Sequence, residues 1–252
     1  MASFVLVPGA GGDPGYWYRV VPPLTGAGHV VVAVDLPNHD GVTLTDQVDA
    51  VVAAAVSAPR PVVLVAQSMG GQLAPAVCDR MPVDALVYLN AMIPAPGETA
   101  GAWWDAVGQS DAAHAAAVRD GRDPDTDVGP EAIFFHDLPD DVVAVLAAGE
   151  GRMPPDSLFT SPQPTRTHPT VPTLVLAGRD DRLFPAELQQ RVAHQRVDVD
   201  VEILPGGHLL ALSQPIVLVT RLLSLLDALC DDRPRVGRVS APAAAAESRR
   251  CR

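Results

Sequence analysis

The chain has 252 residues, of which 48% are hydrophobic, and a formal net charge of −12. This length and apolar fraction suffice for one domain with a large core and an insertion, without stabilising disulfides or metals. The negative charge argues against nucleic acid or an anionic membrane as partner, and the absence of lysine excludes a Schiff-base mechanism.

Targeting and cofactor signals are missing from the sequence. The apolar run at residues 4–7 is too short for a signal peptide, and no apolar stretch reaches the length of a bilayer span. The 3 cysteines have neither metal-ligand spacing nor the even count of a disulfide framework. We therefore expect a cytoplasmic protein that binds no metal or cofactor. Its lysine-free, alanine- and arginine-rich composition is typical of a GC-rich bacterial genome.

Short apolar runs alternate with longer helical patterns along most of the chain. Because most of these runs are apolar throughout, they predict strands that are buried on both faces. Strands are expected at residues 4–7, 30–34, 62–66, 85–89, 173–177 and 199–204. Helices are expected at residues 16–25, 45–57, 69–80, 186–195 and 214–230. This order predicts an α/β fold with a mostly parallel six-stranded sheet flanked by helices.

One long segment interrupts this alternation. No buried strand is expected between residues 95 and 171, and a structureless loop of that length is uncommon in a compact domain. We predict that 95–171 is an inserted, mainly helical lid with helices at 112–119 and 140–148, while 1–94 and 172–230 form the core. The remaining segment, 231–252, has few large apolar residues and is predicted to be disordered.

The strongest chemical signal is Ser68, which follows the predicted strand at residues 62–66. Small residues, Ala66 and Gly70, stand two positions on either side of it, and a helical pattern begins at once. This is the strand–turn–helix context of a nucleophile elbow, where the sharp turn admits only small neighbours. The usual pattern has glycine at the position of Ala66, so this residue is a mild departure. Ser68 is the predicted nucleophile.

A serine nucleophile needs a base to take its proton and a third group to orient that base. Two adjacent carboxylates, Asp180 and Asp181, follow the strand predicted at residues 173–177. A histidine, His208, follows the last predicted strand after two glycines. Serine, acid and histidine therefore follow one another along the chain in the order that is typical of α/β-hydrolases. His208 is the predicted base, and Asp181 is preferred to Asp180 as the acid.

Backbone N–H groups are expected to stabilise the oxyanion that forms when a nucleophile attacks a carbonyl. One candidate is Met69, which follows the nucleophile at the start of its helix, where the helix dipole helps. The other is Ala10 in the glycine-rich loop after the first strand. That loop does not match a dinucleotide-binding motif, because Pro14 occupies the position of the last glycine.

The predicted lid contains apolar side chains that could form the roof of a substrate pocket. These are Trp103, Trp104, Phe134, Phe135, Met153 and Phe159. Gly9 and His136 are further candidates for contact with a substrate. The alternative for each lid residue is packing within the lid itself. The expected partner is a small molecule with apolar acyl or aromatic groups, and a homodimer is left open.

Together these motifs resemble the α/β-hydrolase superfamily, and most closely its group of small plant-type esterases and hydroxynitrile lyases with their bacterial relatives. The similarity spans roughly residues 3–230. It includes the segment from Phe4 to Ala10, the elbow, the residues from Gly178 to Pro185, and Gly207-His208. The resemblance to the acid motif of the group implies that Asp181 is the acid.

Departures from the group's pattern narrow the chemistry that the resemblance implies. Pro8 stands where a histidine usually precedes the oxyanion glycine. The lyases of this group need a lysine soon after the catalytic histidine and a threonine near the oxyanion loop. This chain has Leu209 after His208 and Gly9 in the threonine's place. The resemblance therefore implies ester hydrolysis rather than cyanohydrin cleavage.

The leading hypothesis is a serine hydrolase that cleaves a carboxylic ester of a small, apolar or aromatic substrate through an acyl-enzyme. One alternative is a thioesterase or another acyl-transfer enzyme of a biosynthetic pathway, because the Pro8–Gly12 loop also resembles the start of editing thioesterases. A lyase or lactone hydrolase could use the same three residues. A non-catalytic protein that binds a small ligand in the same pocket is the remaining alternative.

Overall fold

The computed structural model describes residues 1–126, 129–149, 151–165 and 167–231. In these ranges six strands form one sheet in the order β2-β1-β3-β4-β5-β6. The strands are β1 (Ser3–Val7), β2 (Val30–Ala33), β3 (Val62–Gln67), β4 (Ala85–Leu89), β5 (Thr173–Gly178) and β6 (Val201–Leu204). The predicted α/β fold is confirmed, and every strand pair is parallel. Apart from Asp231, the predicted disordered segment 231–252 lies outside the described residues.

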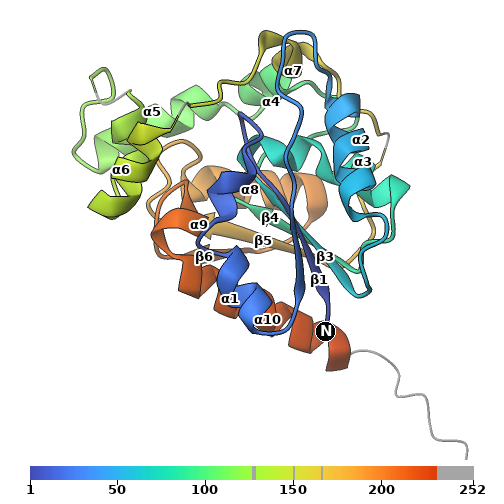
Figure 1. Ribbon diagram of the computed structural model, residues 1–252. Coiled ribbons are helices and arrows are strands. Elements are labelled where there is room, and N and C mark those ends of the chain that lie inside the picture. Colours follow the sequence, from blue (N-terminus) through green and yellow to red (C-terminus); the bar gives the residue numbers. More distant parts are fainter. Residues whose placement is uncertain (127–128, 150, 166, 232–252) are drawn as a thin grey trace, which may run out of the picture.

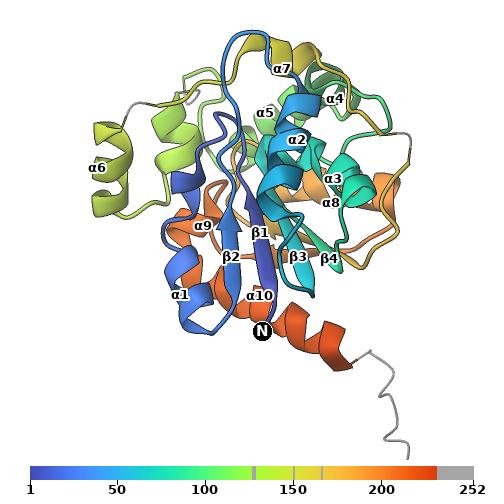
Figure 2. The ribbon, with the colours of Figure 1, turned by 45° about the vertical axis from the view of Figure 1, so that its right-hand side comes forward.

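The central strands are apolar throughout because both of their faces are covered. Every residue of β1, β3 and β4 is buried. Alternate side chains of β3 enter two separate hydrophobic clusters, with Leu64 in one and Val63 and Val65 in the other. The helices α2 (Leu44–Ala55), α3 (Ala74–Arg80) and α8 (Ala186–Val197) contribute to the first cluster. The helices α1 (Val21–Gly26) and α10 (Pro215–Asp231) contribute to the second, on the opposite face (Figure 2).

Strand register aligns the carboxyl ends of the strands at one edge of the sheet. The terminal pairs are Val7 with Ala66, Gln67 with Leu89, and Gly178 with Leu204. The segments that follow β1, β3, β5 and β6 therefore leave the sheet at the same edge. These segments contain the predicted oxyanion loop, nucleophile, acid and base.

Two helices that were predicted to be continuous are each divided into two elements, so these two predictions are wrong. The helix expected at 16–25 is divided into a 3₁₀ turn, η1 (Pro14–Trp17), and α1. The helix expected at 69–80 is divided into η2 (Ser68–Gln72), also 3₁₀, and α3. In both cases proline explains the break: Pro22 and Pro75 lie in the first turn of α1 and α3, where a missing N–H is tolerated.

The segment between β4 and β5 is mainly helical and lies over the carboxyl edge of the sheet (Figure 1). It contains α4 (Ala100–Ala106), α5 (Gln109–Arg119), the π-helical turn η3 (Glu131–Phe135), α6 (Asp140–Ala148) and α7 (Asp156–Thr160). Of these, α6 has the predicted bounds, α5 begins earlier than predicted, and α4 and α7 were not predicted. A short helix, α9 (Leu210–Ser213), precedes α10. None of the helices in the described ranges is long and apolar enough to cross a membrane.

Candidate active site

Ser68 lies on a sharp turn between β3 and η2. Its φ is +51°, which is uncommon for a residue with a side chain. A Cβ atom at Gly70 would lie 2.5 Å from the carbonyl oxygen of Pro8, so this position requires glycine. Ala66 is fully buried in the core, and its methyl group is accommodated there. The departure from the usual elbow pattern is therefore compatible with the turn.

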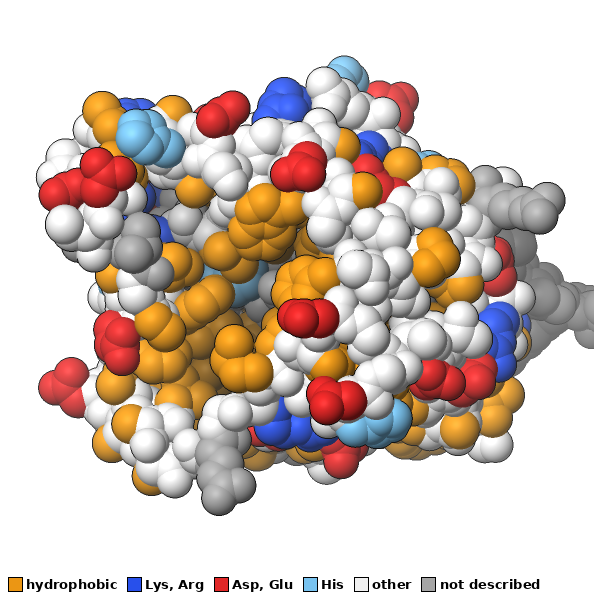
Figure 3. All heavy atoms as spheres, turned by 90° about the horizontal axis from the view of Figure 1, so that it is seen from above, with side chains coloured by type: hydrophobic (Ala, Val, Ile, Leu, Met, Phe, Trp, Pro, Cys, Tyr) orange, Lys and Arg blue, Asp and Glu red, His pale blue; other side chains and the backbone are white. Residues whose placement is uncertain are grey.

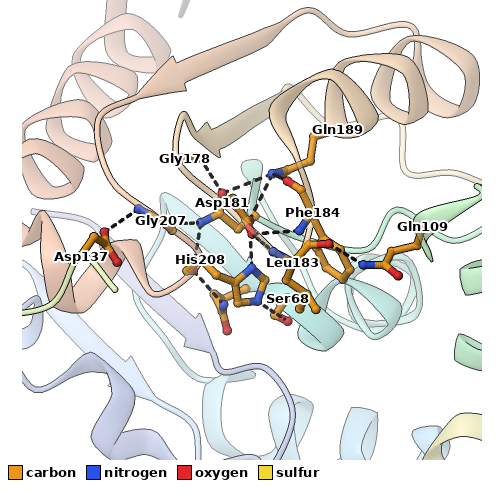
Figure 4. Close-up of polar contacts among 12 residues, drawn as sticks. Ser68, Gln109, Asp137, Gly178, Asp181, Leu183, Phe184, Gln189, Gly207 and His208 are labelled. Atoms are coloured by element: carbon orange, nitrogen blue, oxygen red, sulfur yellow. Dashed lines mark hydrogen bonds and ion pairs between the residues drawn. The ribbon is translucent and has the colours of Figure 1, made fainter. Parts of the chain in front are cut away.

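His208 joins Ser68 and Asp181 in one hydrogen-bonded chain (Figure 4). Its Nε2 lies 2.9 Å from Ser68 Oγ, and its Nδ1 lies 2.8 Å from Asp181 Oδ2. Ser68, Asp181 and His208 are 8%, 4% and 2% exposed, respectively. Three loops that are far apart in the sequence thus bring a serine hydroxyl, an imidazole and a carboxylate into contact.

The carboxylate of Asp181 is held on both of its oxygens. Oδ1 accepts hydrogen bonds from the backbone N–H of Leu183 at 2.9 Å and of Phe184 at 2.8 Å, which leaves Oδ2 directed at His208. This arrangement favours the imidazole tautomer with its proton on Nδ1, so that Nε2 can accept the serine proton. The adjacent Asp180 is exposed, and no interaction in the described residues joins its side chain to His208.

The glycine-rich loop after β1 lies directly beside the serine. A Cβ atom at Gly9 would be 2.7 Å from Ser68 Cβ and 3.3 Å from Ser68 Oγ. The loop is closed by a hydrogen bond from the N–H of Gly12 to the carbonyl of Gly9 at 3.1 Å. Within the described part of the chain, the N–H groups of Ala10 and Met69 have no hydrogen-bond partner. Both N–H groups are therefore available as donors next to the nucleophile.

Gly9→Ala is expected to lower kcat by about 10²- to 10³-fold, the cost of losing one oxyanion donor. The added methyl group collides with Ser68 Cβ, which forces the loop and the Ala10 N–H away from the serine. The measurement is ester turnover by wild type and variant, with melting temperature as a test of folding. Gly26→Ala is the matched control, because no atom lies within 4 Å of its added Cβ. Unchanged turnover in Gly9→Ala would contradict the close approach of this loop.

Asn90 is a positioning residue that the sequence analysis missed. It follows β4 with a φ of +45°, and its side chain is fully buried. Its Nδ2 donates to the carbonyl oxygens of Gly207 and His208, both at 2.9 Å, and its Oδ1 accepts from the N–H of Gly178 at 2.6 Å. One amide thus ties the end of β5 to the histidine loop. The available sequence signal was a lone polar residue at the carboxyl end of a buried strand.

The two tryptophans and the distal lid residues have different environments. Trp103 is 2% exposed and packs 5.1 Å from the ring of Phe184, within the main core cluster. Trp104 is half-buried and lies 5.6 Å from the same ring. Met153 and Phe159 are exposed, with 81% and 37% of their surface accessible. The structure therefore places Trp103 in the core and Met153 and Phe159 at the surface.

Phe134, in the segment between β4 and β5, lies near His208. The ring of Phe134 is 5.5 Å from the imidazole of His208, and Phe135 and His136 are half-buried beside it in sequence. Burial, followed by the nearby Arg182 guanidinium, lowers the pKa of His136 below its usual value. This shift favours the neutral form of the imidazole. These residues remain candidates for contact with a substrate.

The surface above the carboxyl edge is hollowed, and hydrophobic side chains gather around the hollow (Figure 3). A hydrophobic cluster between α6 and α9 contains Leu138, Val142 and Leu212, with half-buried apolar side chains packed against it. These side chains are Tyr16, Phe135, Val143, Leu146 and Leu209.

In the residues that the structure describes, no group of three or more His, Cys, Asp or Glu could hold a metal ion.

A parallel sheet with a serine on the turn after β3, a carboxylate after β5 and a histidine after β6 defines the α/β-hydrolase class. The family model described as the alpha/beta hydrolase family matches residues 4–222, and the chain belongs to this family. Among curated proteins, no sequence matches this chain significantly.

Solved structures share the fold at low sequence identity. Polyneuridine aldehyde esterase is 22% identical with a TM-score of 0.69, covering 90% of this chain and 100% of that chain. A methylesterase from Arabidopsis is 19% identical with a TM-score of 0.68, covering 90% and 100%. A pyrethroid hydrolase from Sphingobium faniae JZ-2 is 22% identical with a TM-score of 0.64, covering 91% and 99%.

Proposed function

We propose that this protein is a serine hydrolase that cleaves a carboxylic ester of a small, apolar or aromatic substrate. The observation that carries the proposal is the buried chain of hydrogen bonds from Ser68 through His208 to Asp181, at 2.9 and 2.8 Å. A hydroxyl in contact with an oriented imidazole is the arrangement that activates a serine for attack on a carbonyl. The triad residues act as nucleophile, base and acid, respectively.

The first half of the reaction forms an acyl-enzyme. As Ser68 Oγ attacks the ester carbonyl carbon, its proton passes to His208 Nε2 and the carbonyl π electrons move onto the oxygen. The N–H groups of Ala10 and Met69 stabilise that oxyanion, while Asp181 stays ionised and stabilises the imidazolium. The intermediate then collapses, the bond to the alcohol oxygen breaks, and His208 gives its proton to that oxygen. The alcohol leaves, and the acyl group remains on Ser68.

The second half returns the enzyme to its starting state. His208 Nε2 takes a proton from a water molecule whose oxygen adds to the acyl carbon. When this second intermediate collapses, the bond to Ser68 Oγ breaks and His208 returns the proton to that oxygen. The carboxylic acid is released, and no oxidant or cofactor is consumed.

Three further observations support an ester as the substrate. The neighbouring structures include proteins whose names identify them as esterases and a pyrethroid hydrolase. The backbone at Gly9 leaves no space for a side chain against Ser68, so a threonine could not stand there without displacing the loop. The chain also has no lysine to follow His208. These features favour acyl transfer to water over cyanohydrin cleavage.

A panel of aryl esters, matching thioesters, lactones and a cyanohydrin tests the proposal with the purified protein. We expect the aryl esters to be hydrolysed with the highest kcat/KM and the cyanohydrin not to be cleaved. Turnover of thioesters without turnover of esters would instead assign an acyl-thioester substrate. Failure of a fluorophosphonate probe to label Ser68, together with no turnover of any compound, would favour the non-catalytic alternative.

Phe135→Ala is expected to lower kcat/KM for an aromatic ester by about 10-fold or more, because burying an aromatic side chain contributes about 1.5–3 kcal/mol. The loss should be smaller for ethyl acetate, whose small acyl and alkyl groups have less apolar surface to bury against this half-buried ring. Val145→Ala on α6 is the control, because this side chain is 58% exposed. Equal losses for both esters would show that Phe135 does not contact the substrate.

A further inference from the structure

The lid is tied directly to the two loops that hold the base and the acid. Arg182, one residue after the triad acid Asp181, donates from Nη1 to the carbonyl oxygen of Ala132 at 2.6 Å. Asp137, two residues after η3, accepts a hydrogen bond on Oδ2 from the N–H of Gly207 at 2.5 Å (Figure 4). A lid segment of a few residues therefore contacts both loops.

The contact of Asp137 requires a glycine next to the base. A Cβ atom at Gly207 would lie 2.8 Å from Asp137 Oδ1 and 3.0 Å from His136 Nε2. The preceding Gly206 has a φ of +112°, and its Cβ would lie 2.8 Å from Gln214 Cγ and 2.9 Å from Ser213 Oγ. Gly207 thus provides space for the lid carboxylate, and Gly206 provides the turn before it.

The peptide groups of Gly207 are held from two sides. Its N–H donates to Asp137 of the lid, and its carbonyl oxygen accepts from Asn90 at the end of β4. Because Gly207 is buried, loss of either partner leaves a buried backbone N–H or carbonyl group without a hydrogen bond, which is energetically costly. Because His208 is the next residue, the orientation of this backbone determines where its imidazole lies relative to Ser68.

We infer that Asp137 is a positioning residue that sets His208 against Ser68 only while the lid is docked on the histidine loop. The inference rests on the proposed function and adds a regulatory feature to it. Displacement of the lid removes the acceptor for the Gly207 N–H and also moves the ring of Phe134 away from His208. Activation of the nucleophile is thereby coupled to closure over the substrate.

This role requires only that residue 137 has an oxygen at the position of Oδ2 to accept the hydrogen bond from the Gly207 N–H. Asp137→Asn keeps such an oxygen, whereas Asp137→Ala removes it. The other carboxylate oxygen, Oδ1, is buried and lacks a hydrogen-bond partner among the described residues, as does the nearby His136 Nε2. An asparagine amide nitrogen in place of Oδ1 therefore breaks no hydrogen bond that Oδ1 makes among the described residues. The asparagine variant is therefore expected to rescue the function.

The rate at which a fluorophosphonate labels Ser68 measures activation of the nucleophile without knowledge of the substrate. We expect Asp137→Ala to slow labelling by about 10- to 100-fold. On an ester, kcat should fall with little change in KM. Asp137→Asn should stay within about 3-fold of wild type. Asp105→Ala is the control, because this exposed lid carboxylate on α4 has no hydrogen bond or ion pair in the described residues.

The outcomes separate this inference from the proposed function. Wild-type labelling rates in Asp137→Ala, or equal losses in Asp137→Asn, would overturn the positioning role and leave the serine hydrolase intact. Absence of Ser68-dependent labelling in the wild type would overturn the proposed function itself. If Asp137→Ala does not fold, Gly207→Ala provides the test, because its methyl group displaces the carboxylate and should slow labelling similarly.

Discussion

Ser68→Ala is expected to reduce ester turnover by about 10⁶-fold and to abolish fluorophosphonate labelling. The substitution removes the only atom that can form the acyl bond, and the remaining base and oxyanion donors cannot replace it. Folding should persist, because alanine is smaller than serine and experiences the same backbone strain at a φ of +51°. Turnover and melting temperature, measured on the same preparation, separate loss of chemistry from loss of structure.

A matched serine variant controls for nonspecific effects. Ser110→Ala changes an exposed residue of α5 and should leave both turnover and labelling at wild-type values. Residual turnover of Ser68→Ala near the wild-type rate, with contamination excluded by active-site titration, would show that another group is the nucleophile.

Asp181→Asn is expected to lower kcat by about 10⁴-fold. An amide N–H directed at His208 Nδ1 would force the imidazole proton onto Nε2, which could then no longer accept the proton of Ser68. The backbone N–H groups of Leu183 and Phe184 can still bond the remaining oxygen, so the loop should keep its conformation. Steady-state kinetics with an aryl ester measure the effect.

The neighbouring carboxylate of Asp180 provides the control for Asp181→Asn. Asp180→Asn makes the same chemical change one residue earlier, at an exposed side chain with no contact to His208 in the described residues. We expect its kcat to stay within about 3-fold of wild type. A larger loss in Asp180→Asn than in Asp181→Asn would show that Asp180, and not Asp181, is the acid.

Local patterns predicted most of the fold and pointed to the three residues that the structure joins by hydrogen bonds, Ser68, His208 and Asp181. Buried parallel strands need uninterrupted apolar runs, and these are visible in the sequence as at residues 62–66. The small neighbours of Ser68 and the glycines before His208 are also local signals. The breaks in the helices at Pro22 and Pro75 had a local cause as well, although periodicity alone did not detect it.

The lid shows where local patterns fail. Trp103 and Phe134 are both aromatic residues of a predicted helical segment, and nothing in the sequence separates them. The structure buries Trp103 in the core and places Phe134 near His208. Met153 was an equal candidate for the pocket roof but is almost entirely exposed. Burial depends on which elements cover a side chain, and periodicity does not contain that information.

The sequence by itself determined the sheet, the elbow at Ser68 and the order of acid and base, because strand periodicity and turn chemistry are local properties. The sequence also favoured Asp181 over Asp180, and the tertiary structure places Asp181 in direct contact with His208. Only the tertiary structure connected Asn90 and Asp137 to Gly207. Those contacts join residues 117 and 70 positions apart. Which distant polar groups meet depends on the packing of every element between them.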